Sequence, residues 1–237
     1  MFERPHHRRI GRVLESLDAE RLRALQCWFG GGTAIALLHG EYRESVDIDF
    51  MVSDLPSYRL LRQAMPTGTT GLAPLLGEGA EPIATERPVR TDQYGIRTML
   101  LVEGVPIKFE IVLEGRIELQ VPGRSRTVNG IATLAEVDLA ASKLLANVDR
   151  WADDSVFGRD AIDLAMMDLP PRRLRPAVEK ASVAYGDSVT EQMLRAIDAF
   201  SQRDGWLLRA TRALSINIPA AAVQSKLRAL RRRLSNL

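Results

Sequence analysis

The sequence predicts an α/β (α+β) protein in which a mixed β-sheet precedes a C-terminal helical domain. A strand, a glycine turn, a helix and an acidic strand follow one another between residues 27 and 52. Residues 95–115 alternate apolar and polar side chains around a central turn, which is typical of a β-hairpin, and the pattern from residue 133 onward is helical. We therefore place the sheet domain at residues 1–130 and the helical domain at residues 131–237.

The first part of the sheet domain contains a short helix and a buried strand. Asp18 is a suitable N-cap for a helix over residues 19–26, and the apolar residues 27–29 then form a strand that enters a glycine turn at residues 30–32. A second helix follows the turn, and residues 43–52 supply the next strand. The turn thus joins a strand to a helix, with an acidic strand close behind.

The remainder of the sheet domain contains one helix and the hairpin. Residues 58–65 are predicted to be helical, whereas the Gly-, Pro- and Thr-rich residues 66–92 are predicted to be mainly loop or irregular strand. The hairpin turns near Glu103 and Gly104, and its second strand carries Glu110. Glu110 is therefore an acidic side chain on a strand that we expect to be half-buried.

The helical domain begins with a capping pattern. Thr133 followed three residues later by Glu136 matches a capping box, which predicts a helix start. Residues three or four apart along this helix form one polar and basic face: Glu136, Ala140, Lys143, Asn147 and Arg150. A second helix starts near Arg159, carries Asp160 and Asp163 one turn apart, and ends before a Pro-Pro pair. The rest of the chain is predicted to be helical.

Composition limits the kinds of site that the chain can build. The chain has 237 residues, 46% of them hydrophobic, with one cysteine and three histidines. Cys27 alone excludes an intramolecular disulfide, and these counts favour an oxygen-ligated metal over a cysteine or histidine site. No apolar run reaches membrane-spanning length, and the N-terminus lacks the apolar core of a signal peptide. We expect a cytoplasmic protein without a membrane partner.

Charge is distributed unevenly along the chain. Residues 170–237 carry 13 Lys and Arg against 5 Asp and Glu, whereas the first 169 residues carry 19 against 25. Five cations without an intervening acid lie near the C-terminus: Lys226, Arg228, Arg231, Arg232 and Arg233. Such a basic tail indicates an anionic partner such as RNA, although an arginine-rich solvated helix face has the same composition.

Two carboxylates interrupt an apolar stretch, VDIDFMV, in the acidic strand. Because side chains alternate between the two faces of a strand, Asp47 and Asp49 lie on one face and repel each other there. A divalent cation between them would offset this repulsion. The alternative is an edge strand whose acidic face is simply solvated.

The preceding glycine turn favours the metal interpretation. Gly31, Gly32 and Thr33 open a helix whose free N–H groups, dipole and Thr33 hydroxyl can hold phosphate oxygens. Mg²⁺ typically bridges one or two protein carboxylates and substrate phosphates. The sequence therefore predicts a site for phosphoryl or nucleotidyl transfer, with Asp47 and Asp49 as metal ligands.

The run GGTAIALLHGEYRESVDIDF resembles the signature of the polymerase-β-type nucleotidyltransferase superfamily, and within it the AbiEii/AbiGii toxin family, which includes the MenT toxins. The matching positions of the glycine turn and of the R-x-S-x-D-x-D motif are Gly31, Gly32, Thr33, Arg43, Ser45, Asp47 and Asp49. Downstream, Lys143 matches a helical lysine of the family, and Arg159 to Leu164 match its K/R-D-x-x-D-L run. The resemblance covers residues 28–168.

The resemblance implies a nucleotidyltransferase fold, an NTP substrate and a divalent cation, Mg²⁺ or alternatively Mn²⁺. It implies a nucleotide-binding set of Gly31, Gly32, Thr33, Arg43, Ser45 and Lys143, and a catalytic set of Asp47, Asp49, Lys143, Asp160 and Asp163. Glu110 stands where the superfamily usually has a third metal-binding aspartate. If Glu110 is structural, Asp160 or Asp163 is the remaining acid.

Similarity to MenT toxins implies transfer of NMP from NTP to the 3′ end of tRNA or another RNA, which would inhibit translation. It also implies a cognate antitoxin as partner, with no DNA partner expected. Two alternatives remain open: a small-molecule nucleotidyltransferase of the antibiotic-modifying type, and a nucleotide- or RNA-binding module without catalysis.

Overall fold

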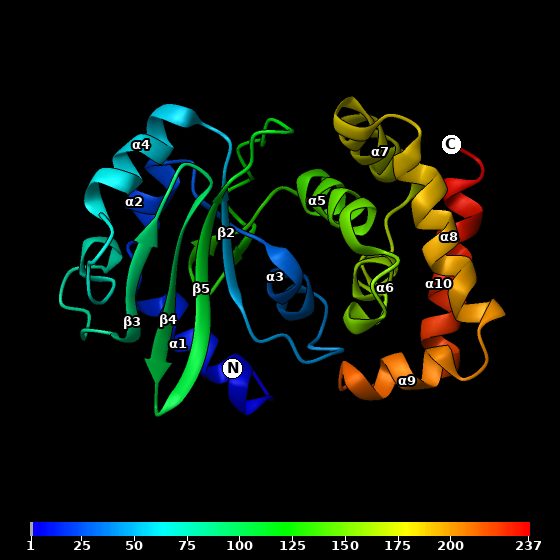
Figure 1. The fold of residues 1–237 in the computed structure, drawn as a ribbon, viewed down its shortest axis with the longest axis horizontal. Coiled ribbons are helices and arrows are strands. Elements are labelled where there is room, and N and C mark those ends of the chain that lie inside the picture. Colours follow the sequence, from blue (N-terminus) through cyan, green and yellow to red (C-terminus); the bar gives the residue numbers. More distant parts are fainter. Residues whose placement is uncertain (1) are drawn as a thin grey trace. The chain divides into compact units, whose positions relative to one another are not determined.

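A computed structural model of the chain describes residues 2–237 (Figure 1). The chain forms two compact units. The sheet unit comprises Met1–Leu38 and Ser45–Ala135, and the helical unit comprises His39–Glu44 and Glu136–Leu237. This partition differs from the predicted domain ranges mainly because the short segment that precedes Ser45 groups with the helices.

The sheet unit is built on a five-stranded mixed sheet with the strand order β1-β2-β5-β4-β3. The strands are β1 (Trp28–Phe29), β2 (Ile48–Val52), β3 (Ala84–Thr91), β4 (Gly95–Val102) and β5 (Val105–Leu113). The pair β2 and β5 is parallel, whereas the other three pairs are antiparallel. The predicted α/β (α+β) class with a mixed sheet is confirmed.

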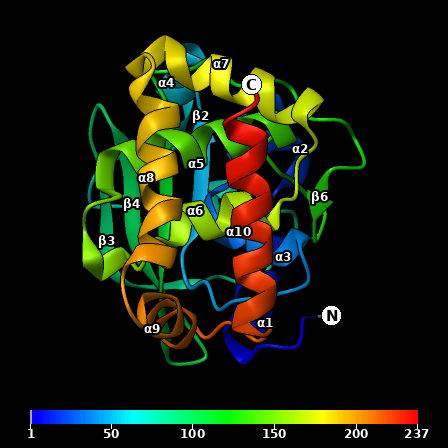
Figure 2. The ribbon, with the colours of Figure 1, turned by 90° about the vertical axis from the view of Figure 1, so that its right-hand side faces the viewer.

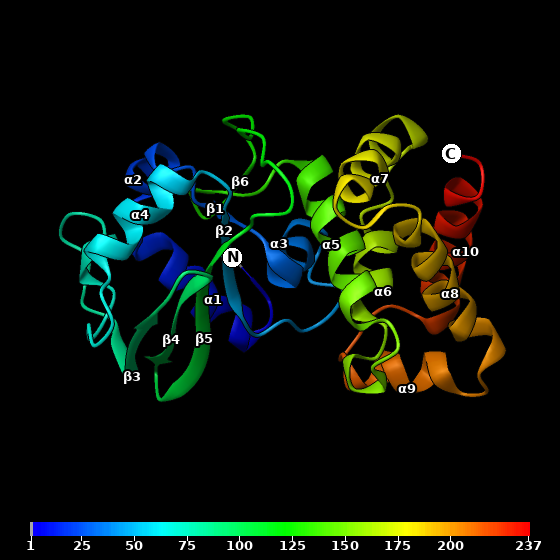
Figure 3. The ribbon, with the colours of Figure 1, turned by 45° about the horizontal axis from the view of Figure 1, so that its top comes forward.

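The predicted hairpin is formed by β4 and β5, which lie side by side with β3 in Figure 3. Its turn is at Glu103 and Gly104, both with positive φ. Ile107, Phe109 and Ile111 are buried, as expected for alternate residues of a strand that covers a core with one face. The alternation pattern in the sequence was sufficient to find this hairpin.

Residues 66–92 were predicted to be mainly loop or irregular strand, and their last part is an irregular strand, β3, at Ala84–Thr91. This edge strand pairs only with β4, and its register is irregular around Pro88. Val89 is its one buried residue, so the sequence of β3 lacks the alternation that indicates a strand. Proline has no N–H for a ladder, which agrees with an edge position.

The predicted strand over residues 43–52 was too long at its N-terminal end. β2 begins at Ile48, so Asp47 precedes the strand and Asp49 is its second residue. Val46, which would share a face with Ile48 and Phe50 if the strand continued, is 46% exposed. Side-chain contacts, rather than strand pairing, therefore hold the residues just before Asp47.

Further short elements complete the sheet unit. They are α1 (Pro5–Ser16), α2 (Ala19–Ala24), α3 (Gly31–Leu38), α4 (Leu55–Ala64), the 3₁₀ turn η1 (Ala73–Leu75), and the small ribbon of β6 (Thr127–Val128) and β7 (Ile131–Ala132). The side chain of Asp18 accepts a hydrogen bond from the Arg21 N–H at 2.9 Å, which confirms the predicted N-cap of α2.

The helical unit contains six α-helices among the described residues. They are α5 (Glu136–Arg150), α6 (Arg159–Met166), α7 (Pro171–Tyr185), α8 (Ser188–Gln202), α9 (Trp206–Ala213) and α10 (Ala220–Leu234), with the 3₁₀ turn η2 (Asp154–Val156) between α5 and α6. Figure 2 shows α8 and α10 running side by side, and α5 packs against α6, α7 and α8. The predicted C-terminal helical domain is confirmed.

The predicted capping box at the start of α5 was wrong. The helix begins at Glu136. Thr133, three residues before that start, forms a β-bridge with Phe29. The Thr133 hydroxyl lies 3.4 Å from the Leu134 carbonyl oxygen and does not cap the helix. Pairing of this segment with β1 overrides the local capping signal.

No helix in residues 2–237 combines the length and the apolarity that a membrane crossing requires.

Candidate active site

The paired acids lie at the N-terminal end of β2, where Asp47 directly precedes the strand and Asp49 is its second residue. Ile48 and Phe50 are buried, whereas Asp47 and Asp49 are half-buried. Asp49 is in register with Glu110 on the parallel strand β5. Neighbouring residues in register share a face of the sheet, so Glu110 stands beside Asp49.

The glycine turn brings the helix α3 against Asp49. Gly31 has φ +67°, a conformation that side chains disfavour, and it is the first residue of α3. A Cβ added at Gly31 would collide with the Oδ2 atom of Asp49. The preceding residue, Gly30, donates its N–H to the Asp49 carbonyl oxygen at 2.8 Å. A carboxylate therefore lies at a helix N-terminus, where the dipole and free N–H groups favour negative charge.

Thr33 and Ser45 join the helix to the segment before β2. The buried Thr33 hydroxyl donates to the Asp47 carbonyl oxygen at 2.6 Å and lies 2.8 Å from the Ser45 hydroxyl. In this structure the Thr33 hydroxyl is thus engaged within the protein, although the sequence assigned it to phosphate. It fixes the backbone of Asp47 relative to α3.

Two cations that sequence reasoning missed neutralise Glu110. Its Oε1 accepts a hydrogen bond from Arg97 on β4, and its Oε2 accepts one from Lys108 Nζ at 2.6 Å. Burial by itself would raise the pKa of Glu110, but the hydrogen bonds and charges of Lys108 and Arg97 lower it. Lys108 precedes Glu110 by two residues on one strand, so the period of two could have indicated this pair.

Lys108 also interacts electrostatically with Asp47 and Asp49. Burial alone would lower its pKa, yet the hydrogen bond and charge of Glu110 raise it, and Asp49 and Asp47 raise it further. Three carboxylates of the sheet unit therefore lie within electrostatic range of one ammonium group. This shared cation reduces the repulsion among them.

The donor set of Asp47 and Asp49 fits a hard divalent cation. Both are carboxylates, and Mg²⁺ typically takes one or two protein carboxylates and completes its shell with water and substrate phosphates. Within residues 2–237, no group of three or more acids, histidines or cysteines is already arranged around a metal position. The carboxylate pair and the lack of a preformed group of three protein ligands in residues 2–237 both agree with a metal that is bound jointly by Asp47, Asp49 and a nucleotide.

The helical unit holds a second cluster of predicted site residues. Lys143 Nζ on α5 lies 2.9 Å from Asp160 Oδ1 and 2.7 Å from Asp163 Oδ2, both on α6. Arg150, two turns along α5, donates from Nε to Asp160 Oδ2 at 2.7 Å. Lys143, Asp160 and Asp163 are buried, so the polar face predicted for α5 is packed against α6.

Asp163 is the centre of this cluster. It is fully buried and accepts hydrogen bonds from the Tyr42 hydroxyl at 2.5 Å, Arg43 Nε at 2.7 Å and Arg43 Nη2 at 2.9 Å. Burial alone would raise its pKa, but the charges of Arg43 and Lys143 hold the pKa well below the ordinary value of an aspartate. Both oxygens of Asp163 are therefore occupied by protein donors.

The structure divides the predicted site residues between the two units. The sheet unit contains Gly31, Gly32, Thr33, Ser45, Asp47, Asp49 and Glu110. The helical unit contains Arg43, Lys143, Asp160 and Asp163. Arg43 and Ser45, neighbours in one sequence motif, thus belong to different clusters, and Arg43 is held by Asp163.

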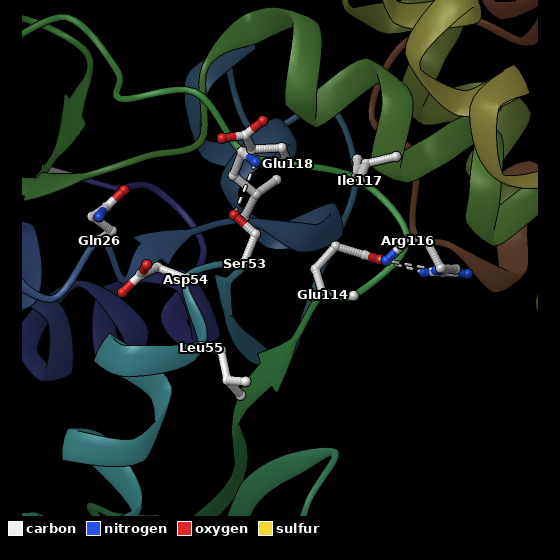
Figure 4. A pocket seen from close by; sticks show the side chains of 10 residues that line it. Gln26, Ser53, Asp54, Leu55, Glu114, Arg116, Ile117 and Glu118 are labelled. Atoms are coloured by element: carbon white, nitrogen blue, oxygen red, sulfur yellow. Dashed lines mark hydrogen bonds and ion pairs between the residues drawn. The ribbon is translucent and has the colours of Figure 1, made fainter.

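A separate pocket of about 450 Å³ lies beyond the other end of β2 (Figure 4). Ser53 and Asp54, which follow β2, line it together with residues 114–119, which follow β5. The Ser53 hydroxyl accepts the Leu119 N–H at 2.9 Å, and Glu114 pairs with Arg116 at 2.8 Å. None of the predicted site residues lines this pocket, so it is distinct from the D-x-D site.

Comparison with known protein families shows a match over most of the chain. The family described as "Nucleotidyl transferase AbiEii toxin, Type IV TA system" matches residues 12–228. The chain belongs to the AbiEii family. The resemblance inferred from the glycine turn and the D-x-D motif is confirmed, and the protein is a member of a nucleotidyltransferase toxin family of type IV toxin–antitoxin systems.

Two crystal structures share the fold of this AbiEii protein. JHP933 from Helicobacter pylori superimposes with a TM-score of 0.54 at 13% identity, covering 100% of this chain and 96% of that chain. A protein described as a candidate nucleotidyltransferase from H. pylori gives a TM-score of 0.51 at 15% identity, covering 98% and 95%. No curated protein matches the sequence significantly. The structural likeness supports the predicted fold class.

Gly31 allows a direct test of the contact between α3 and Asp49. Gly31→Ala should lower nucleotidyl transfer by about a hundredfold, because the new methyl group displaces the Asp49 carboxylate by an ångström or more. Gly104→Ala is the matched control, since Gly104 also has a positive φ (+76°) but has open space around its Cβ position. The measurement is the steady-state rate of nucleotidyl transfer by each variant. If Gly31→Ala and Gly104→Ala lost the same fraction of this rate, backbone strain alone would explain the loss in Gly31→Ala.

Proposed function

We propose that this AbiEii protein transfers NMP from NTP to the 3′ end of tRNA and so inhibits translation. The acceptor hydroxyl attacks the α-phosphorus, a new phosphorus–oxygen bond forms, and the bond to the β-phosphate oxygen breaks, which releases pyrophosphate. The hydroxyl proton leaves to a carboxylate or to water. The observation that carries the proposal is the Asp49 carboxylate at the N-terminus of α3, in a member of a nucleotidyltransferase family.

In this proposal the sheet unit provides the residues that bind the nucleotide phosphates and the metal ion. Asp47 and Asp49 hold Mg²⁺, or alternatively Mn²⁺, which would neutralise phosphate charge during the transfer. The N–H groups of Gly31 and Gly32 at the start of α3 bind phosphate oxygens. We assign the role of third acid to Glu110, since it is in register with Asp49. Lys108 and Arg97 contact Glu110 in this structure, so Glu110 would have to exchange these partners to hold a cation.

The helical unit contributes Lys143 to the nucleotide. An ammonium group has three N–H donors, and the contacts to Asp160 and Asp163 account for two of them. We assign the third donor to a nucleotide phosphate. Asp160 and Asp163 then act as positioning residues that orient Lys143, and Asp163 also orients Arg43.

The type IV toxin–antitoxin family also suggests partners. We propose that a cognate antitoxin counteracts the enzyme, that both act in the cytoplasm, and that neither DNA nor a membrane is involved. The antitoxin proposal rests on family membership.

The basic tail supports an RNA acceptor only in part. Lys226 and Arg233 pair with Asp168, and Arg231 pairs with Asp198. Within the described residues, Arg228 and Arg232 form no such ion pair, and they lie four residues apart on one exposed face of α10. These two side chains are therefore the best phosphate contacts that α10 offers.

Changing both Arg228 and Arg232 to Gln should flatten the salt dependence of tRNA binding. Each lost phosphate contact lowers the slope of log affinity against log salt by roughly 0.7, so the double variant should lose about 1.4. Arg231→Gln, which removes an arginine already paired with Asp198, is the control and should change the slope little. The measurement is tRNA affinity over a salt series. An unchanged slope in the double variant would identify α10 as a solvated face.

A labelling experiment separates the proposed function from its alternatives. Each α-labelled NTP is incubated with the protein, Mg²⁺ and one of three acceptors: tRNA, total protein or aminoglycosides. Label at the tRNA 3′ end is the expected result. Label on an aminoglycoside would support the small-molecule enzyme instead, and nucleotide binding without transfer to any acceptor would support the inactive binding module.

A further inference from the structure

The N-terminal helix α1 holds the segment that leads into the D-x-D strand. His7 is fully buried, and its Nε2 accepts a hydrogen bond from the Ser45 N–H at 3.0 Å. The neighbouring His6 Nε2 lies 3.0 Å from the Val46 carbonyl oxygen. The two histidines thus contact backbone groups of two successive residues, Ser45 and Val46, directly before Asp47. Both histidines precede the residues that the family matches, 12–228, whereas their partners Ser45 and Val46 lie within that range.

The chemistry of these contacts fixes the role of each ring. A backbone N–H can only donate, so His7 Nε2 must be the unprotonated, accepting nitrogen. A backbone carbonyl can only accept, so His6 Nε2 must carry the proton and donate it. One histidine therefore fixes the N–H side of this short segment and the other fixes its carbonyl side.

The segment before Asp47 depends on such contacts because it has no strand partner. β2 begins at Ile48, and the residues before it form no ladder. Side-chain hydrogen bonds to residues 45–47 come from His6, His7 and Thr33, the last through the Ser45 hydroxyl and the Asp47 carbonyl. Without His7, the Ser45 N–H loses its acceptor in a partly buried position, which favours movement of the segment.

We propose that His7 is a positioning residue for nucleotidyl transfer: it holds the Ser45 amide and thereby places Asp47. The catalytic consequence rests on the proposed function, whereas the hydrogen bond itself can be measured independently of it. Since His7 does not contact the substrate in this proposal, its loss changes kcat more than the KM for NTP.

A pair of amide variants tests the proposal. In His7→Gln the side-chain oxygen can reach the place of Nε2 and accept from Ser45, whereas in His7→Asn the same group is one carbon shorter and cannot. We expect His7→Gln to keep kcat within about threefold of wild type. His7→Asn should lose about tenfold in kcat, the effect of one hydrogen bond, with little change in the KM for NTP. Arg8→Gln, on the same helix, is the control for general changes in α1.

Hydrogen exchange at the Ser45 amide provides the second readout. Protection should fall about tenfold in His7→Asn and remain in His7→Gln. The proposal would be overturned if His7→Asn kept the amide protection and the kcat of wild type. It would also be overturned if His7→Gln and His7→Asn lost protection and kcat equally and had a lowered Tm, because that result would indicate a packing role for His7. If the wild-type protein shows no NMP transfer, the proposed function fails, and the exchange data alone decide whether His7 holds Ser45.

Discussion

Asp163→Asn should lower the free energy of unfolding of the helical unit by about 3 to 5 kcal/mol, the usual cost of removing one partner from a buried ion pair. The substitution keeps the shape of the side chain but removes its charge. Arg43 and Lys143 then stay buried beside a neutral amide, and two of the four donors that now contact the carboxylate meet an NH₂ group instead, because each oxygen of Asp163 contacts two donors. Denaturant unfolding followed by circular dichroism measures the effect.

Asp168→Asn is the matched control for this substitution. Asp168 also receives two cations, Lys226 and Arg233, but its side chain is 49% exposed. Exposed ion pairs contribute at most about 1 kcal/mol, so the control should be nearly neutral. A loss as small for Asp163→Asn as for Asp168→Asn would contradict the structural role that we assign to Asp163.

The pH dependence of stability offers a second check on Asp163. Its pKa is depressed in the folded protein, so its contribution is fully present above the unfolded value of about 3.9 and is lost as the pH falls toward the folded value. The wild-type protein should therefore lose more stability than Asp163→Asn when acidified below about pH 4. The difference between the two proteins should be constant at neutral pH.

The parts of the fold that the sequence predicted are those with a strong local pattern. The alternation around Ile107, Phe109 and Ile111 revealed the hairpin because one face of β5 covers the core. β3 carried no such signal, since an edge strand with one buried residue, Val89, has little reason to alternate. The capping box at Thr133 was a real local preference, but pairing with Phe29 overrode it.

The site was predictable residue by residue but not in its arrangement. The period of two placed Asp47 and Asp49 on one face, yet the register of Asp49 with Glu110 depends on the parallel pairing of β2 and β5, which are distant in sequence. The ion pair of Arg43 with Asp163 joins residues 120 positions apart. No pattern within one motif indicates that Arg43 and Ser45, two residues apart, belong to different units.

Asp49→Asn and Asp47→Asn should each abolish NMP transfer, by at least about a thousandfold, while leaving the fold intact. A bound cation contributes several kcal/mol to stabilising the transition state, and about 4 kcal/mol corresponds to a thousandfold in rate. Asparagine fills the same space but offers one neutral oxygen to the metal. Stability should change little, because each change removes one of the acids that repel each other at the start of β2, which offsets the lost attraction to Lys108 and, for Asp49, to the N-terminus of α3.

The experiment measures transfer of labelled NMP together with the rise in Tm caused by Mg²⁺ and a non-hydrolysable NTP. Binding of this ligand to the native state alone raises Tm, so both variants should lose the Mg²⁺-dependent part of the rise as well as activity. Glu86→Gln, an exposed acid on β3 of the same unit, is the control and should keep both. Transfer within tenfold of wild type in either aspartate variant would remove that aspartate from the metal site. Lost transfer with an unchanged Mg²⁺-dependent rise in Tm would instead place the aspartate in proton transfer from the acceptor hydroxyl, because the cation and the nucleotide would still bind.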